Sequence, residues 1–180
     1  MIKEILTSLR AILVLTVITS IAYPLVITGI GQLAFPSQAN GSLVKSGDQV
    51  VGSALLAQKF TDAKYFWPRP SAADYATVAS GASNQGFTSQ KNLDTINQRR
   101  TSLGNDAPAD LLTASGSGLD PDISPEAARF QIARVAAARK LSPEAVSKIV
   151  DTTTQGPQLG FLGEPRVNVL ALNRALNLAK

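Results

Sequence analysis

Near its N-terminus the chain carries a long stretch without a single charged side chain. No Asp, Glu, Lys or Arg occurs between Arg10 and Lys45, and the strongly apolar part covers residues 11–35. About 20 apolar residues suffice to cross the hydrocarbon core of a bilayer. The stretch therefore predicts one transmembrane helix over residues 11–35, preceded by a short tail, residues 1–10, and followed by one soluble domain, residues 36–180.

A cleaved signal peptide is the main alternative for this stretch, because Ser37, Gln38 and Ala39 place small residues near a plausible cleavage position. The apolar core of a signal peptide is only about 7–15 residues long. The greater length here favours an uncleaved anchor. Lys3 and Arg10 precede the span, and cations are enriched on the cytoplasmic side of membrane helices. We therefore expect a cytoplasmic N-terminus and an extracytoplasmic soluble domain.

Polar residues inside the span predict how the helix packs. Pro24 lacks the amide that would bond the Ser20 carbonyl, so we expect a kink, or a neighbour that satisfies this carbonyl. Thr16, Ser20 and Tyr23 share one face of an ideal helix. Small and hydroxyl side chains favour close packing against another transmembrane helix, although lone spans also tolerate them.

The soluble part is long enough to bury its own core, and its patterns mix helices with short strands. Strands are expected within residues 41–51 and 109–113. Helices are expected over residues 53–60 and 89–103, after each of the two Ser-Pro-Glu triplets at 124–126 and 142–144, and at the C-terminus, where Val169, Leu172 and Leu176 share a face. The predicted fold class is α+β, with a single N-terminal membrane helix.

Composition excludes several kinds of chemistry. The chain has no cysteine and no histidine, so disulfides, thiolate catalysis and the commonest metal ligands are absent, and we expect no metal site. Asp120 and Asp122 lack the further ligands of a calcium loop, and Asp120, which precedes Pro121, is interpreted as a turn former. The net charge of +4 comes from scattered cations, which disfavours nucleic-acid binding.

One catalytic pattern occurs. Ser42 and Lys45 match the S-x-x-K spacing of serine acyl-enzymes, which makes a membrane-anchored exported serine hydrolase a remote alternative. The companion motifs of those enzymes are missing, so a strand leading into a turn is the simpler interpretation.

A Ser/Gly loop precedes the first Ser-Pro-Glu helix. Ser115, Gly116, Ser117 and Gly118 have the composition of an anion cradle, but no lysine follows as in a phosphate-binding P-loop, so an ordered turn is favoured. In the helix itself, Gln131 lies beside a buried apolar stripe. It is interpreted either as a hydrogen-bonding residue at the rim of the core or as a ligand contact.

Five blocks of the chain resemble one protein family in order and spacing. The family is KdpC, the C subunit of the Kdp potassium-transporting ATPase, a P-type complex. The blocks are GSALLAQKF, YFWPRPSA, SGASNQG, SGSGLDPDISPEAARFQIARVAAAR and GEPRVNVLALNRAL.

The resemblance implies a non-catalytic accessory subunit of a high-affinity potassium importer in the bacterial inner membrane. Its partners would be a channel-like potassium-conducting subunit, a P-type ATPase subunit and the lipid bilayer. The family is described as a catalytic chaperone that raises the ATP affinity of the ATPase subunit through a ternary complex, with its helix glutamine, here Gln131, contacting ATP. The Ser/Gly loop is the other candidate nucleotide contact.

The expected topology conflicts with this role. An extracytoplasmic domain holds Gln131 away from cytoplasmic ATP. The alternative function is an extracytoplasmic cap that stabilises the assembly and shapes potassium access without binding nucleotide.

Overall fold

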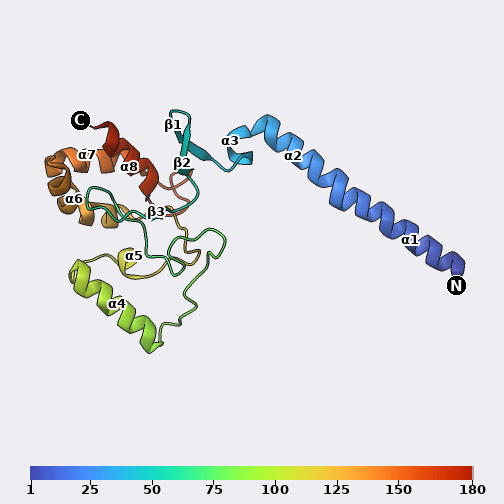
Figure 1. The fold of residues 1–180 in the computed structure, drawn as a ribbon, viewed down its shortest axis with the longest axis horizontal. Coiled ribbons are helices and arrows are strands. Elements are labelled where there is room, and N and C mark those ends of the chain that lie inside the picture. The colour runs from blue at the N-terminus through green and yellow to red at the C-terminus, as the bar shows by residue number, and fades with distance from the viewer. Residues whose placement is uncertain (180) are drawn as a thin grey trace. The chain divides into compact units, whose positions relative to one another are not determined.

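A computed structural model describes residues 1–179, and the chain divides into two compact units, Met1–Leu43 and the part from Val44 onward. The first unit is mainly one helical rod, shown at the blue end of Figure 1. It comprises α1 (Ile2–Thr16), the π-helical segment η1 (Val17–Ala22) and α2 (Tyr23–Ala34), followed by the single turn α3 (Pro36–Ala39).

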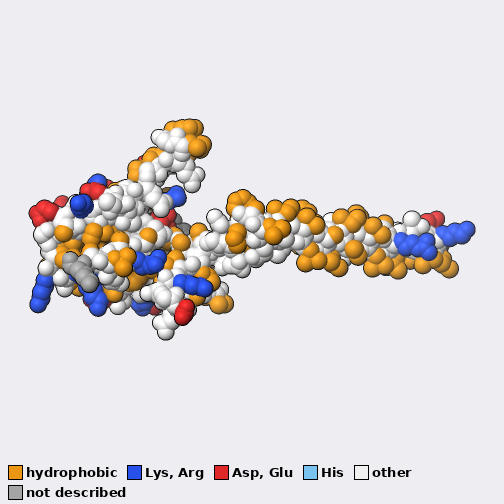
Figure 2. Space-filling view, turned by 90° about the horizontal axis from the view of Figure 1, so that it is seen from above, with side chains coloured by type: hydrophobic (Ala, Val, Ile, Leu, Met, Phe, Trp, Pro, Cys, Tyr) orange, Lys and Arg blue, Asp and Glu red, His pale blue; other side chains and the backbone are white. Residues whose placement is uncertain are grey.

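The rod runs unbroken over Ile2–Ala34 and is long and apolar enough to cross a membrane. None of the side chains of α1, η1 or α2 is buried. Figure 2 shows hydrophobic side chains along its length and cations gathered near its N-terminal end. An exposed apolar surface of this extent needs lipid or partner helices to cover it.

The predicted irregularity at Pro24 takes the form of the π-helical segment. Proline supplies no amide for the helix ladder, and the turn before it widens so that the Tyr23 amide donates to the carbonyl five residues earlier, at Ile18. A π-turn rotates the residues that follow it, so Thr16, Ser20 and Tyr23 do not keep ideal α-helical spacing.

The second unit contains two small antiparallel sheets. The first consists of β1 (Leu43–Ser46) and β2 (Gln49–Ser53), as predicted for residues 41–51. The second has the order β3-β5-β4, with β5 (Arg166–Asn168) between β3 (Asp122–Ile123) and β4 (Thr154–Gln155). Its register pairs Ile123 and Thr154 with Val167, which is fully buried.

The helices of this unit are α4 (Gln90–Leu103), α5 (Ala109–Leu112), α6 (Pro125–Arg139), α7 (Pro143–Thr153) and α8 (Val169–Leu178). The helix starts predicted at the two Ser-Pro-Glu triplets are confirmed. The Ser124 Oγ accepts from the Ala127 amide at 3.0 Å, and the Ser142 Oγ accepts from the Ala145 amide at 3.2 Å. The predicted helix at 89–103 and the C-terminal helix are also confirmed.

The core lies where α6, α7 and α8 pack against one another and against β5 (Figure 1). Phe66 joins it from a loop far away in sequence. Each fully buried Val, Leu, Ile or Phe contributes roughly 1.5–3 kcal/mol of transfer free energy. The largest fully buried apolar side chains are Phe66, Ile123, Val135, Val146, Val150, Val167, Val169, Leu172 and Leu176.

Two predicted elements were wrong. Residues 53–60 do not form a helix: Ser53 ends β2, residues 54–56 form a turn, and residues 57–60 have no regular structure. The Ser53 Oγ does accept from the Leu55 amide, but the Ala57 amide bonds the distant Leu119 carbonyl. Residues 109–113 contain the short helix α5 instead of a strand. There the Thr113 amide bonds the Ala109 carbonyl, and this turn buries Leu111 and Leu112. At residues 53–60 a tertiary contact overrides the local pattern.

Candidate functional site

Gln131, the predicted site residue of α6, is almost completely buried, with only 3% of its surface exposed. Its Oε1 accepts from the Trp67 amide at 2.8 Å and from Arg134 Nη2 at 2.6 Å. Its Nε2 donates to the carbonyls of Trp67 at 3.1 Å and Ala127 at 3.3 Å. The side-chain amide thus pairs with both main-chain groups of Trp67, as a neighbouring strand would, and its hydrogen-bonding capacity is full.

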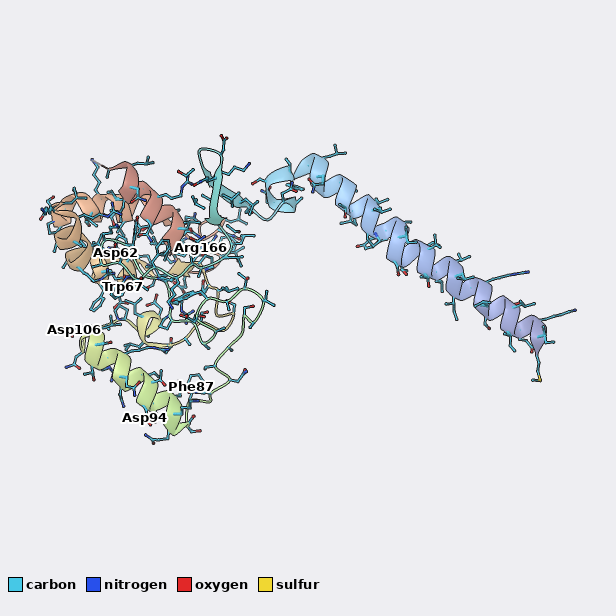
Figure 3. All side chains as sticks on the ribbon, in the orientation of Figure 1. Asp62, Trp67, Phe87, Asp94, Asp106 and Arg166 are labelled. Carbon is cyan, nitrogen blue, oxygen red and sulfur yellow. The ribbon has the colours of Figure 1, made fainter. Side chains whose placement is uncertain are left out.

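Asn173 on α8 pairs in the same way with Phe66, the residue before Trp67. Its Oδ1 accepts from the Phe66 amide at 2.8 Å and its Nδ2 donates to the Phe66 carbonyl at 3.0 Å. Sequence reasoning missed this residue. The available signal was an asparagine placed directly after Leu172, in a helix that also carries the polar residues Arg174 and Asn177. We call Gln131 and Asn173 the amide pair, because together they fix two successive main-chain units (Trp67 is labelled in Figure 3).

Two arginines of α6 hold the same loop. Arg134 stacks on the Trp67 ring, with Cζ 3.6 Å from the ring centroid, and donates to the carbonyls of Ala63 and Tyr65. Burial lowers the pKa of Arg134 to about 10. Arg139 donates to the Lys64 carbonyl of the loop and to the Leu176 carbonyl of α8, so it ties the end of α6 to both segments.

A cavity of about 570 Å³ opens beside Gln131. Its walls include the rings of Trp67 and Tyr75 and the guanidinium groups of Arg99 and Arg134. Burial lowers the pKa of Arg99 and raises the pKa of Tyr75. An apolar cavity with cationic groups has the chemistry to accept an anion attached to a ring or an aliphatic group.

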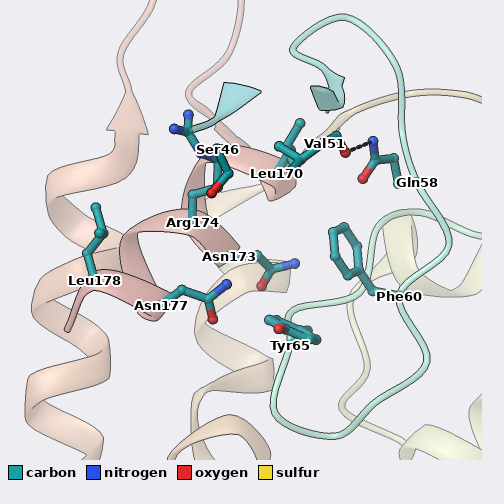
Figure 4. Close-up of a pocket in the computed structure, with 10 residues that line it drawn as sticks. All are labelled: Ser46, Val51, Gln58, Phe60, Tyr65, Leu170, Asn173, Arg174, Asn177 and Leu178. Atoms are coloured by element: carbon teal, nitrogen blue, oxygen red, sulfur yellow. Dashed lines mark hydrogen bonds between the residues drawn. The ribbon is translucent and has the colours of Figure 1, made fainter. Parts of the chain in front are cut away.

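A smaller cavity, of about 280 Å³, is lined by Asn173 and other residues of α8 and by Phe60 and Tyr65 of the loop (Figure 4). Figure 4 shows Asn173 projecting from α8 toward Phe60 and Tyr65. The Gln58 side chain is already bound to the Val51 carbonyl at 2.8 Å. The remaining lining comprises Ser46, Leu170, Arg174, Asn177 and Leu178, and thus holds one cation and no carboxylate.

The Ser/Gly loop is an ordered turn in its contacts. The Ser115 amide bonds the Pro70 carbonyl, and the Ser117 Oγ accepts from the Leu119 amide. Gly118 has a φ of +71°, and a Cβ there would lie 2.8 Å from the Gly81 carbonyl oxygen. The 570 Å³ cavity beside Gln131 takes none of its walls from Ser115, Gly116, Ser117 or Gly118.

Asp120 and Asp122 act as turn and pairing residues. Asp120 pairs with Arg69 at 3.1 Å and accepts from the Asp122 amide, while Asp122 pairs with Arg166 at 3.3 Å. Within residues 1–179, no group of three or more potential metal-ligating side chains is found.

None of the other predicted residues lines the 570 Å³ cavity. Thr16, Ser20, Tyr23 and Pro24 belong to the N-terminal rod, and their packing against a partner helix stays a prediction. Ser42 and Lys45 fall on opposite sides of the boundary between the two compact units, so no site geometry is argued from this pair.

Comparison with known proteins agrees with the five blocks of sequence. The family profile described as "KdpC: K+-transporting ATPase, c chain" matches residues 5–178. A potassium-transporting ATPase KdpC subunit from Citrifermentans bemidjiense is 51% identical over 184 residues, covering 97% of this chain and 97% of the relative. One from Bradyrhizobium diazoefficiens is 48% identical over 198 residues, covering 99% and 98%. The chain therefore belongs to the KdpC family, the C chain of the K+-transporting ATPase.

Proposed function

We propose that this chain is a non-catalytic subunit that anchors in the bacterial inner membrane and stabilises an ATP-driven potassium import complex from the extracytoplasmic side. The observation that carries the proposal is the rod Ile2–Ala34, whose apolar side chains are all exposed within its own chain. Lipid and the transmembrane helices of other subunits are the partners that cover such a surface. These subunits are a channel-like potassium-conducting chain and a P-type ATPase chain.

The charge pattern supports the orientation. Lys3 and Arg10 lie in the first third of the rod, and the next cation is Lys45, beyond its far end. The positive-inside tendency then puts the N-terminus in the cytoplasm and the domain outside. In that compartment the domain acts as a cap over the path of potassium into the conducting subunit.

Site-specific labelling tests this orientation. Gln131 is too buried to label, so the cysteine belongs on the exposed Lys148 of α7. Because the chain has no cysteine of its own, a Lys148→Cys variant carries a single reactive thiol. We expect a membrane-impermeant maleimide to react with intact spheroplasts. Protection in spheroplasts, followed by labelling of inverted vesicles, would refute the extracytoplasmic domain.

The assembly role has its own test. Deletion of the chain is expected to abolish potassium uptake and to reduce co-purification of the other two subunits. Unchanged uptake without this chain would refute the role. A Ser42→Ala variant is expected to keep full uptake, whereas the hydrolase alternative ties Ser42 to an acyl-transfer activity.

A nucleotide role as a catalytic chaperone is the second candidate, and the cavity beside Gln131 favours it. Arg99 and Arg134 supply cations for phosphates, and Trp67 and Tyr75 supply rings for a base. In this role the domain raises the ATP affinity of the ATPase subunit. The Gln131 amide, already saturated with protein partners, favours the cap role instead.

Two neighbouring arginines on α4 separate these roles. Arg99 lines the cavity, while Arg100 is exposed on the same helix. If the domain contacts nucleotide, Arg99→Gln raises the KM for ATP of the assembled complex and Arg100→Gln leaves it unchanged. We expect neither variant to change this KM, and an increase confined to Arg99→Gln would refute the nucleotide-free cap.

A further inference from the structure

The loop joining β4 to β5 exposes large apolar side chains. Leu159 is 83% exposed, Phe161 75% and Leu162 49%. All three lie within residues 156–163, which we call the apolar hairpin, and Gln158 and Leu162 form an antiparallel bridge across it. Exposed apolar side chains gathered on one short loop mark a surface that another phase or molecule covers.

The apolar hairpin carries no charge. Between Asp151 and Glu164 the chain has no Asp, Glu, Lys or Arg. The hairpin can therefore leave water without the large cost of desolvating an ion. Contact with another protein would not require a whole loop to be free of charge, because charged residues at the rim of a protein interface stay in water.

Several main-chain groups of the hairpin pair with one another. The Gln158 amide donates to the Leu162 carbonyl at 2.8 Å, and the Leu162 amide donates back at 2.9 Å. The amides of Gly160 and Phe161 bond the carbonyls of Pro157 and Gln158. Internal pairing of main-chain groups is the condition for placing a loop in or near hydrocarbon.

The bilayer is within reach by chain length. The membrane-crossing rod ends at Ala34, and β1 begins at Leu43. A connection as short as residues 35–42 spans at most roughly 28 Å even when fully extended. The domain is thus tethered at the surface of the membrane in which the rod is anchored.

We propose that the apolar hairpin is a second membrane contact, in which Leu159, Phe161 and Leu162 enter the boundary between phospholipid headgroups and acyl chains. Together with the rod, this contact restricts the rotation of the domain about its short tether. The proposal rests on the membrane anchoring proposed above and adds to it a lipid-facing surface of the domain.

Fluorescence in nanodiscs tests this contact with the full-length chain. Phe161→Cys is labelled with an environment-sensitive nitrobenzoxadiazole, and Leu178→Cys on α8 is the control, because Leu178 is also apolar and 82% exposed. We prefer position 161 to position 159 because Leu159 has a φ of +54°. We expect lipids with a shallow nitroxide to quench the probe at 161 and aqueous iodide to lose its effect there. The probe at 178 should respond to iodide only.

Three outcomes overturn the proposal. The first is a probe at 161 that behaves like the probe at 178. The second is a probe at 161 that is shielded from iodide only when the other ATPase subunits are present, without nitroxide quenching, because a protein surface then covers the hairpin. The third is quenching that persists unchanged in a Leu159→Asp, Leu162→Asp double variant, since those charges oppose insertion. Alkaline extraction checks the membrane anchor separately. If the chain resists extraction while the probe at 161 remains accessible to iodide, the rod is anchored and only the hairpin contact is refuted.

Discussion

Removal of the Gln131 amide should destabilise the domain, whatever its role toward nucleotide. In a Gln131→Leu variant the volume is nearly kept, but the Trp67 amide, the Trp67 carbonyl and one guanidinium nitrogen of Arg134 lose their partner. Each buried polar group left unpaired costs about 1–3 kcal/mol. Trp67 is only half-buried, so water compensates in part, and we expect a total loss of about 2–4 kcal/mol.

Asn173→Leu is the matched control, because it removes the two corresponding bonds to the amide and carbonyl of Phe66. At about 4 °C per kcal/mol for a domain of this size, both variants should lower Tm by roughly 8–16 °C. The assay is thermal unfolding of the full-length chain in detergent, followed by near-ultraviolet circular dichroism of Trp67. A Gln131→Leu variant with the Tm of the unsubstituted chain would refute the structural role of the amide. Loss of a nucleotide response in Gln131→Leu but not in Asn173→Leu, measured below both Tm values, would support a direct contact.

Three further predictions concern the same domain. Gly118→Ala should cost about 1–3 kcal/mol, because its φ of +71° disfavours a side chain and the new Cβ meets the Gly81 carbonyl; Gly116→Ala, with open space around it, should be nearly neutral in urea unfolding. Tyr75 should ionise above its reference pKa of 10.0, so the stability it contributes is present below pH 10 and is lost as the pH rises through its raised pKa; Tyr75→Phe should remove the latest component of an absorbance titration at alkaline pH. Ser124→Ala should cost about 1 kcal/mol by removing the cap of α6, and unchanged urea unfolding would contradict that capping role.

Local signals in the sequence predicted the elements whose causes are local. The serine caps and following prolines set the starts of α6 and α7, because the bonds that begin those helices span three residues. The uncharged stretch predicted a long apolar helix for the same reason, since charge and length are read directly from the chain, and the rod Ile2–Ala34 is long and apolar enough to cross a membrane. The error at residues 53–60 came from a contact with a residue far away in sequence, which propensity does not contain. At 109–113 the short helix is closed by its own main-chain bond and buries Leu111 and Leu112.

In the candidate site, too, the sequence indicates what is local and does not indicate the partners that lie far away in sequence. The sequence indicated Gln131 as a hydrogen-bonding residue near the core, but its partner Trp67 is 64 residues away. Asn173 went unnoticed because its partner Phe66 is 107 residues away, and an asparagine in a helix gives no indication of which main chain it will bind. A buried amide of this kind is recognised from sequence only when the segment it pairs with is already known.

These long-range bonds bear on the choice between the cap and the chaperone. The loop carrying Phe66 and Trp67 is held by the amide pair and by Arg134, so one wall of the 570 Å³ cavity is fixed before anything binds. A ligand that enters such a cavity pays little conformational entropy. The same rigidity suits a cap, because a domain that restrains other subunits must itself resist deformation. Arg99 reaches the cavity from α4 without belonging to the amide pair, and it is therefore the residue at which occupancy of the cavity can be tested without loosening the loop.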